Sequence, residues 1–532
     1  MTRRSAFPIS ATCGSERKPA TCMNQFSDPR AVPLENGATL ATPPARQYSA
    51  MVERNTGKNA DILLDNEPLS TLRPVARRQA LAKAREYTRA LGLDPGPEPN
   101  PEAPIIASGH QPLPFHPGIM IKPVVLVKEA EAMGATPLFI TVDSDEFRAE
   151  NTPLPTISGE RLARLDFPLF PMKTHGLYEA APAEPVEDML SRFEAMVGFM
   201  EDSRLDQPRN ALLSYTDKLR KRNLDFPDYV SRAIVMRRLW LAPAVDKFME
   251  LPVSILCQQN TFLRFATHIM ADIPQFAGEY NRALDRYRKE HRLRYPANPF
   301  PNLEISGDLV QAPFWALDGG NRQKLFVKQD GECATVVTEK GEERPLGHIV
   351  EGKLAIRPKA ITLSLYLRLV LCDLFIHGVG GAKYDDISDA LIRNYFGAQP
   401  PELACLSATL WPDLHADDPR QEIATAEQKL RDIDQHPEKA GAGRPQIDRL
   451  AALKGELVLA IKEPGADKKT IGQRIRELNQ SMATLLADDK RALEMELERL
   501  APVEQERQVA QARDYPCFFI QTGDLIKMSA SK

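Results

Sequence analysis

The residues best suited to chemistry stand together in the stretch SGHQPLPFHPG, which begins at Ser108. His110 and Gln111 can each donate and accept hydrogen bonds, and a neutral imidazole is a common general base. Gly109 and Gly118 permit tight turns and let the main chain come close to a ligand. We therefore expect His110 to act as a base or to orient a substrate, and Gln111 to hydrogen-bond it. A purely structural turn rich in glycine and proline is the alternative.

His116 directly precedes a helix that the apolar pattern predicts over residues 119–133. The start of a helix carries unpaired N–H groups and the positive end of the helix dipole, and both suit an anion. We therefore place His116 beside a predicted anion site. It is better suited to a structural role at the helix start than to catalysis.

A second polar stretch, FITVDSDEF, places Asp143 and Asp145 on either side of one serine after an apolar run. Two carboxylates at this spacing can share a divalent cation through their oxygens. The same D-x-D pattern occurs in nucleotide-sugar glycosyltransferases, which gives an alternative function that predicts dependence on a divalent cation. An acidic turn exposed to solvent is the structural alternative.

A third stretch, FIHGVGGAKYDD, has His377 at the end of an apolar run and Lys383 in the first turn of the helix that follows. Its glycines are Gly378, Gly380 and Gly381. A glycine-rich loop at a helix start can cradle a phosphate or a carboxylate, with the lysine as counter-charge. Arg357 lies upstream in AIRPKA and is a further candidate ligand for the anion. The spacing is neither that of a Walker A loop nor G-x-G-x-x-G, and a plain tight turn is the alternative.

The elements around these stretches predict a parallel sheet. Residues 104–108 are expected to form a buried strand, residues 119–133 a helix ending at Gly134, and residues 136–143 the next strand. A strand, a helix and a strand within about 40 residues are typical of a parallel sheet with a right-handed crossover. Ligands bind at the carboxyl ends of such strands, where the three polar stretches begin.

The whole chain is predicted to be an α/β protein with a Rossmann-like parallel-sheet core, a helical insertion and a C-terminal antiparallel coiled-coil arm. Heptad spacing of leucine and isoleucine over residues 471–500 predicts the coiled coil, through which a homodimer could form. The expected segments are a disordered extension at 1–65, the core at 66–419 with a helical insertion at about 185–295 and an antiparallel β piece at about 309–350, the arm at 420–510, and a strand and tail at 511–532 that return to the core.

Composition excludes several classes of protein. The 532 residues are 43% hydrophobic and 26% charged with a net charge of −4, an ordinary soluble balance that gives no sign of a nucleic-acid-binding surface. No apolar run approaches the length of a membrane-spanning helix, so no membrane partner is expected. The seven cysteines form no C-x-x-C pair, which favours reduced thiols in a cytoplasmic protein.

In this order, the segments resemble the cysteine-adding enzymes of bacillithiol synthesis, the BshC family. The resemblance covers about residues 104–520 and rests on GHQPLPFHPGIMIK, FITVDSDEF, IRPKA, HGVGGAKYDD and the arm. The family's early turn is followed by a helix with a lysine, which corresponds to Lys122, and its glycine turn leads to a tyrosine, which corresponds to Tyr384. Where the family has an acidic stretch with histidine and a Pro-Gly-Glu, this chain has Ser144 and Gly381 to Lys383, which brings positive charge to a place where the family has a carboxylate.

The resemblance implies a ligase that forms a C–N (amide) bond on a small anionic substrate, with a sugar-linked molecule as one candidate. Lys122 and Tyr384 would then belong to the substrate-binding set, and Asp143 and Asp145 would hold a cation or the substrate amine. Amide formation from a free acid requires activation, so ATP is the expected cosubstrate and the protein would be nucleotide-binding. A non-catalytic scaffold or a small-ligand-binding protein built around the arm is the remaining alternative.

Overall fold

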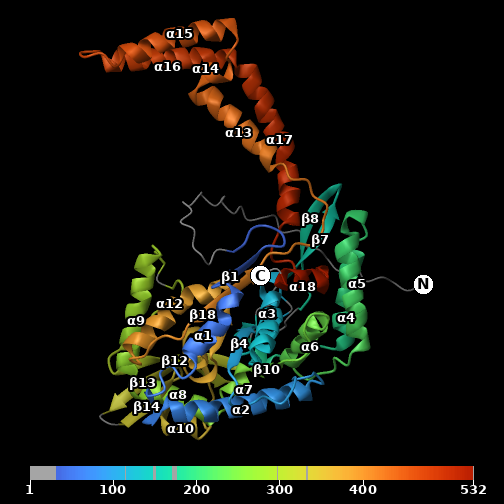
Figure 1. Ribbon diagram of the computed structural model, residues 1–532, viewed down its shortest axis with the longest axis vertical. Coiled ribbons are helices and arrows are strands. Elements are labelled where there is room, and N and C mark those ends of the chain that lie inside the picture. The colour runs from blue at the N-terminus through green and yellow to red at the C-terminus, as the bar shows by residue number, and fades with distance from the viewer. Residues whose placement is uncertain are drawn as a thin grey trace.

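The protein is described here from a computed structural model that covers residues 32–113, 115–147, 151–170, 176–295, 297–330 and 333–530. The disorder predicted for residues 1–31 lies outside the described residues. The chain forms a globular body from which one group of helices projects (Figure 1). Within the described residues, no helix combines the length and the apolar character that crossing a membrane requires.

A six-stranded sheet lies at the centre of the body, in the order β1-β18-β17-β4-β5-β10. All neighbouring strands are parallel except β1, which pairs antiparallel with β18. The strands are β1 (Thr39–Thr42), β4 (Ile105–His110), β5 (Thr136–Thr141), β10 (Met249–Pro252), β17 (Leu374–His377) and β18 (Leu403–Ala408). The mixed α/β class and the largely parallel sheet are therefore confirmed.

Both faces of this sheet are buried, as a parallel sheet requires. Side chains alternate between two apolar clusters, so that Ile105 and Ala107 of β4 join one cluster and Ile106 joins the other. The first cluster includes helices α2 (Leu69–Ala90), α8 (Asn260–Ala271), α9 (Ile273–Glu290) and α12 (Val379–Asn394). The second includes α3 (Pro117–Met133), α4 (Val186–Gly198), α5 (Asp206–Lys221) and α6 (Tyr229–Leu241).

Helix α3 joins β4 to β5 and has the boundaries that its sequence predicts to within two residues. His116 caps its start, Pro117 occupies the first helical position, and Gly134 ends it in a left-handed conformation with φ 62°. The helix is apolar nearly all round because it lies between the sheet and the C-terminal segment, where Cys517 donates a main-chain hydrogen bond to Phe115. The predicted strand-helix-strand unit is confirmed.

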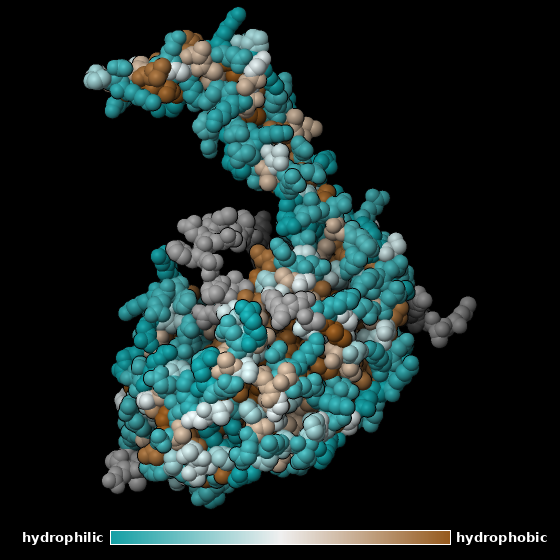
Figure 2. Space-filling view, viewed as in Figure 1, coloured by the Kyte–Doolittle hydropathy of each residue, from teal (hydrophilic) through white to brown (hydrophobic). Residues whose placement is uncertain are grey.

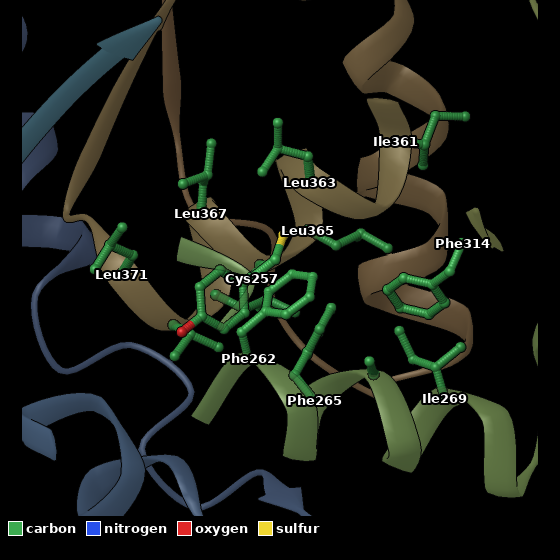
Figure 3. Packing of buried hydrophobic residues seen from close by; sticks show 14 of the residues in the cluster. Cys257, Phe262, Phe265, Ile269, Phe314, Ile361, Leu363, Leu365, Leu367 and Leu371 are labelled. Carbon is green, nitrogen blue, oxygen red and sulfur yellow. The ribbon is translucent and has the colours of Figure 1, made fainter. Parts of the chain in front are cut away.

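A second, antiparallel sheet confirms the predicted β piece. Its strands are β11 (Ile305–Ser306), β12 (Leu309–Asp318), β13 (Asn321–Asp330), β14 (Cys333–Thr338), β15 (Glu343–Pro345) and β16 (Ile356–Pro358). Phe314 of β12 packs with Phe262 of α8 and with residues of α11 (Ala360–Tyr366), which holds this sheet against the body (Figure 3).

Shorter elements complete the body. They are the pairs β2 (Leu63–Leu64) with β3 (Glu67–Pro68), β6 (Glu146–Phe147) with β9 (Gly176–Leu177) and β7 (Thr152–Ser158) with β8 (Arg161–Phe167), and the helices α1 (Tyr48–Asn55), α7 (Val253–Leu256), α10 (Gly347–Val350) and α18 (Thr522–Ala530). A π-helical turn, Leu367–Leu371, follows α11.

Five helices form the projection, which is largely hydrophilic on the face shown in Figure 2. They are α13 (Arg420–Gln435), α14 (Pro437–Ala440), α15 (Pro445–Ala460), α16 (Lys468–Leu485) and α17 (Ala487–Ala510). A small apolar cluster of Ile433, Ile447, Met482 and Leu486 joins them. Met482 belongs to the predicted heptad seam, whereas Leu485 of the same seam is 43% exposed, so the seam is only partly buried.

Three predicted segments need correction. Residues 39–55 are not disordered, because β1 pairs with β18 and α1 contacts β17. The region 185–295 is not only a helical insertion, because its strand β10 pairs with β5 in the central sheet. In the described part of residues 511–532 there is no strand: a 3-10 turn at Cys517–Phe519 and helix α18 return to the body instead.

Candidate functional site

A cavity of about 440 Å³ opens at the carboxyl ends of the central strands. The strand register explains why the polar stretches meet there: His110 pairs with Thr141 of β5, and Ile376 of β17 pairs with Ser108. The ends of β4, β5 and β17 are therefore level, and the residues that follow each strand share one edge.

Most of the predicted site residues line this cavity. They are Gly109, His110, Gln111, His116, Gly118, Lys122, Asp145, His377, Gly378, Gly380 and Gly381. Four predicted site residues are not among the lining residues: Asp143, Arg357, Lys383 and Tyr384. The structure thus brings the first polar stretch to the cavity and divides the other two, FITVDSDEF and FIHGVGGAKYDD.

Three of the glycines are required by close packing. A Cβ atom at Gly109 would lie 2.6 Å from the carbonyl oxygen of Ile140, and one at Gly118 would lie 2.6 Å from that of Ala408. A Cβ atom at Gly381 would lie 2.5 Å from Nδ1 of His377. The absence of these side chains keeps β4 close to β5 and leaves room for the His377 ring.

His110 is held in its neutral form. Burial lowers the pKa of His110 well below its usual value, and the nearby positive charge of Lys122 acts in the same direction. Its ring packs edge-on against Phe115 with centroids 4.2 Å apart. Nδ1 is buried and has no hydrogen-bond partner among the described residues, and other atoms of His110 line the cavity. The lowered pKa makes His110 a weak base, and its role in orienting a substrate stays a prediction.

His116 closes the start of α3 instead of leaving it open. Its Nδ1 accepts a hydrogen bond from Gly118 N (3.2 Å), and its carbonyl oxygen accepts one from Ile119 N (2.9 Å). Burial lowers the pKa of His116 to about 4, which keeps Nδ1 available as an acceptor. The expected anion site at this helix start is therefore wrong, because the cap has taken its N–H groups, while the structural role suggested for His116 is confirmed.

Lys122 is the least expected feature of the cavity. Its side chain is on α3 and the residue is 2% exposed, yet it has no carboxylate within ion-pair distance among the described residues. Nζ donates a hydrogen bond of 2.6 Å to the carbonyl oxygen of Gly109. Burial, together with the charge of Arg237, lowers the pKa of Lys122 to about 7. A large fraction of this amine is therefore uncharged near neutral pH.

His377 lies opposite, beside a buried carboxylate that was not among the predicted site residues. Its Nε2 is 2.9 Å from Oδ2 of Asp385 on α12, which is an ion-pair distance. The contact does not have the geometry of a hydrogen bond, and Nε2 has no hydrogen-bond partner among the described residues. Ser364 donates a hydrogen bond of 2.5 Å to Oδ1 of Asp385, and Arg368 donates one of 3.0 Å to Oδ2. Burial opposes ionisation, but Arg368 and His377 outweigh it and hold the pKa of Asp385 below its usual range.

The start of α12 is open to the cavity. Gly378 is its N-cap and supplies no side-chain acceptor, and Gly378, Val379, Gly380 and Gly381 all line the cavity. The first N–H groups of a helix have no acceptor within it, so they can bind an anion. The prediction that the glycines stand at the start of a helix is confirmed.

Arg513, in the C-terminal segment, is a further cavity residue that sequence reasoning missed. It donates hydrogen bonds to Thr409 Oγ1 (2.6 Å) and to the carbonyl oxygen of Ala408 (2.9 Å), which fix it at the end of β18. No local pattern identifies it, because its place depends on the return of the chain to the body.

The two carboxylates of the D-x-D pattern face different partners. Asp143 accepts hydrogen bonds from the main-chain N (2.9 Å) and the hydroxyl of Ser254, and burial raises its pKa to about 6. Asp145 accepts from Gln111 Nε2 and from Arg322, both at 3.1 Å. Among the described residues no group of three or more His, Cys, Asp or Glu side chains is arranged to hold a metal ion. A shared cation at Asp143 and Asp145 is therefore not what this geometry favours.

Arg357 was predicted beside the glycine loop and lies elsewhere. It is buried in an ion pair with Glu179, with N–O distances of 2.6 and 3.0 Å. Its charge is thus matched within the protein, and the expectation that it binds the anion is wrong. Tyr384 is also away from the cavity, where its ring packs against Phe300 with centroids 5.1 Å apart.

A second cavity of about 400 Å³ adjoins the first and shares Asp145 with it. On its wall, Arg322 and Lys359 both lie over the ring of Trp315, at 4.8 and 4.6 Å from the ring centroid. Burial lowers the pKa of Lys359 to about 8. The two cavities together could hold a ligand with two polar ends.

No protein-family model matches the chain, and no curated protein matches it in sequence.

Proposed function

We propose that the protein is an enzyme of the BshC type, a ligase that joins a small amine to a carboxylic acid in the cavity at the carboxyl edge of a Rossmann-like core. The observation that carries the proposal is that one cavity contains the buried amine of Lys122, whose hydrogen bond goes to a carbonyl oxygen, the ring of His110 and the open start of α12. An amide bond forms when an uncharged amine attacks an activated carboxyl group. The Lys122 amine suits the first reactant, whose ammonium group must lose a proton, and the start of α12 suits the anionic substrate.

Each group has a distinct role in this proposal. The N–H groups that begin at Gly378 bind the carboxylate or phosphate of the anionic substrate. The Lys122 amine accepts a proton from the incoming ammonium group, since the pKa of a general base should lie near the working pH. His110 lines the cavity and orients the substrate, and Gln111, held by Asp145, hydrogen-bonds it. ATP supplies the activation of the acid, and a divalent cation would accompany it.

The glycosyltransferase alternative is less favoured, because Asp143 and Asp145 turn to different partners. The test of the ligase proposal is to incubate the full-length protein with cysteine, a glucosamine-malate amine and Mg-ATP and to search for the condensation product by mass spectrometry. We expect a product whose mass equals that of the two reactants less water, absent when the amine is omitted. Failure to form any product with cysteine or with other amino acids as the acid component would overturn the proposal.

We also propose that α13–α17 form a coiled-coil arm through which two copies of the chain associate. Apolar side chains are exposed on the outer helices: Leu453 is 50% exposed and Leu459 67% on α15, and Met495 is 63% exposed on α17. Sedimentation should give a dimer for the native protein and a monomer for L453E/L459E, with E456Q as the control on the same helix. A native monomer at micromolar concentration would contradict the arm's proposed role.

A further inference from the structure

The cavity contains an amine that its surroundings leave without a counter-charge. Lys122 is 2% exposed, and its only hydrogen bond among the described residues goes to the carbonyl oxygen of Gly109. Lysine is almost never fully buried without a charged partner, because removing an ammonium ion from water is costly. Such a position is maintained where the amine has a chemical role.

The charged and titratable groups around Lys122 reinforce this. Arg237 of α6 lies near it and is ion-paired with Glu250 at 2.7 Å, so this carboxylate is already engaged by another cation. His110 of β4 and the capping His116 are the imidazoles on this side, and Cys405 of β18 is a buried thiol. None of these groups gives the amine a negative partner.

We propose that Lys122 forms an imine with a small aldehyde or 2-oxo acid whose carboxylate is bound at the start of α12. The inference goes beyond the proposed ligase function and does not rest on it. Its geometric basis is that the end of β4, which accepts the Lys122 hydrogen bond at Gly109, lies directly beside the end of β17, after which α12 begins.

The reaction requires only the two reactants. The nitrogen lone pair of Lys122 attacks the carbonyl carbon, a C–N bond forms, and the π bond to oxygen breaks to give a carbinolamine. The C–O bond then breaks, the C=N bond forms, and both amine hydrogens leave with the oxygen as one water molecule. His110 can relay one of these protons, because a neutral imidazole carries a proton on one nitrogen and accepts on the other.

The state of the amine makes the site selective. Burial lowers the pKa of Lys122 to about 7, so near pH 7.5 most of it is uncharged. A surface lysine with the ordinary pKa of about 10.4 is uncharged only to about 0.1% at that pH. We therefore expect Lys122 to react on the order of 10 times faster than surface lysines, after allowing for the lower nucleophilicity of a weaker base.

The test is reductive trapping in the full-length protein. Glyoxylate or pyruvate is added at low millimolar concentration with sodium cyanoborohydride, and the adduct is located by intact mass and by peptide mapping. We expect one adduct per chain, on Lys122, and its loss in K122R, which keeps a positive charge but forms no imine under these conditions. K359R is the matched control, because Lys359 lines the second cavity and burial lowers its pKa too. Trapping in the K359R variant should give the same adduct on Lys122 as in the native protein.

Two further comparisons decide the ligand class and protect the test against misfolding. Acetaldehyde, which has no carboxylate, should label Lys122 at least tenfold more slowly than glyoxylate if α12 binds the anion. Mapping in the native protein locates the adduct even if K122R does not fold. Adducts spread over surface lysines, or a native protein without an adduct on Lys122, would overturn the proposal. A negative ligase assay would leave it standing, since trapping needs neither ATP nor an amine substrate.

Discussion

Nε2 of His377 lies 2.9 Å from Oδ2 of Asp385, and this pair joins the end of β17 to helix α12 at the wall of the cavity. The carboxylate is 3% exposed and is shared with Arg368 and Ser364. A buried carboxylate among these partners stabilises the fold and also fixes the ring of His377 toward the cavity. The site and the core are therefore coupled through Asp385.

Replacing Asp385 by asparagine should destabilise the protein by about 3 kcal/mol, because Arg368 would keep a buried charge with only Asp389 to balance it. Chemical unfolding of D385N at neutral pH measures this. D386N, at the exposed neighbouring position on α12, is the control and should change the stability by less than about 0.5 kcal/mol.

The same variant has a pH signature. The pKa of Asp385 is lowered in the folded state, so its contribution is present above the unfolded-state pKa of about 4 and is lost as the pH falls below that value. The stability difference between native protein and D385N should therefore narrow as the pH falls below about 4. An equal difference at neutral and acidic pH would mean that the carboxylate is not ionised in the fold.

Adjacent glycines at the start of α12 should respond in opposite ways to alanine. A Cβ atom at Gly381 would meet Nδ1 of His377 at 2.5 Å, whereas at Gly380 there is nothing within 4 Å. G381A should push the His377 ring aside and lower the melting temperature. G380A should raise the stability by about 0.5–1 kcal/mol, because alanine is the better helix former. Equal effects in calorimetry would contradict the close approach of His377 to Gly381.

The part of the fold that sequence predicted well is the part set by local signals. Helix α3 was placed to within two residues because its apolar pattern begins at Ile119 and Gly134 marks its end. Strand β10 was missed because four residues, MELP, carry little pattern of their own. Its identity comes from pairing with β5, which is distant in the sequence.

The same distinction between local signals and long-range contacts applies to the residues of the site. His110 and the glycines of α12 line the cavity as expected, because strand ends and helix starts can be located from the sequence, whereas Lys122 was assigned to the site only through the family resemblance. Arg357 was misplaced because its partner, Glu179, lies in a segment without any motif. Asp385 was missed, although the sequence contains a signal for it. Ala382, Asp385 and Ser388 are spaced three apart and lie on the buried side of α12. A carboxylate on the buried side of a helix requires a buried partner.

Asp143 should make the stability fall as the pH rises from about 4 to about 6. Burial raises its folded-state pKa to about 6, so between the unfolded and the folded value only the folded state holds the proton. The loss across this range should be about 3 kcal/mol, since each pKa unit corresponds to about 1.4 kcal/mol. D143N keeps an acceptor for Ser254 N and carries no charge, so urea unfolding at a series of pH values should show a flatter profile. A D143N profile as steep as that of the native protein would assign the effect to another group.

Lys122 should produce a change of the opposite kind at higher pH. Its folded-state pKa of about 7 lies below the usual value for lysine, so between the two values the unfolded state binds more protons and stability rises with pH. K122M removes the cost of burying a charge, so it should be more stable than the native protein at about pH 6, by on the order of 2–4 kcal/mol. That advantage should shrink steadily as the pH rises through about 9.

K122R, which stays charged at every pH, should be less stable than the native protein at the alkaline end. Chemical unfolding of the native protein, K122M and K122R from acidic to alkaline pH measures all of these differences. If the native protein and K122M ran parallel over the whole range, the amine of Lys122 would not be uncharged in the cavity, and both of its proposed reactions would lose their basis.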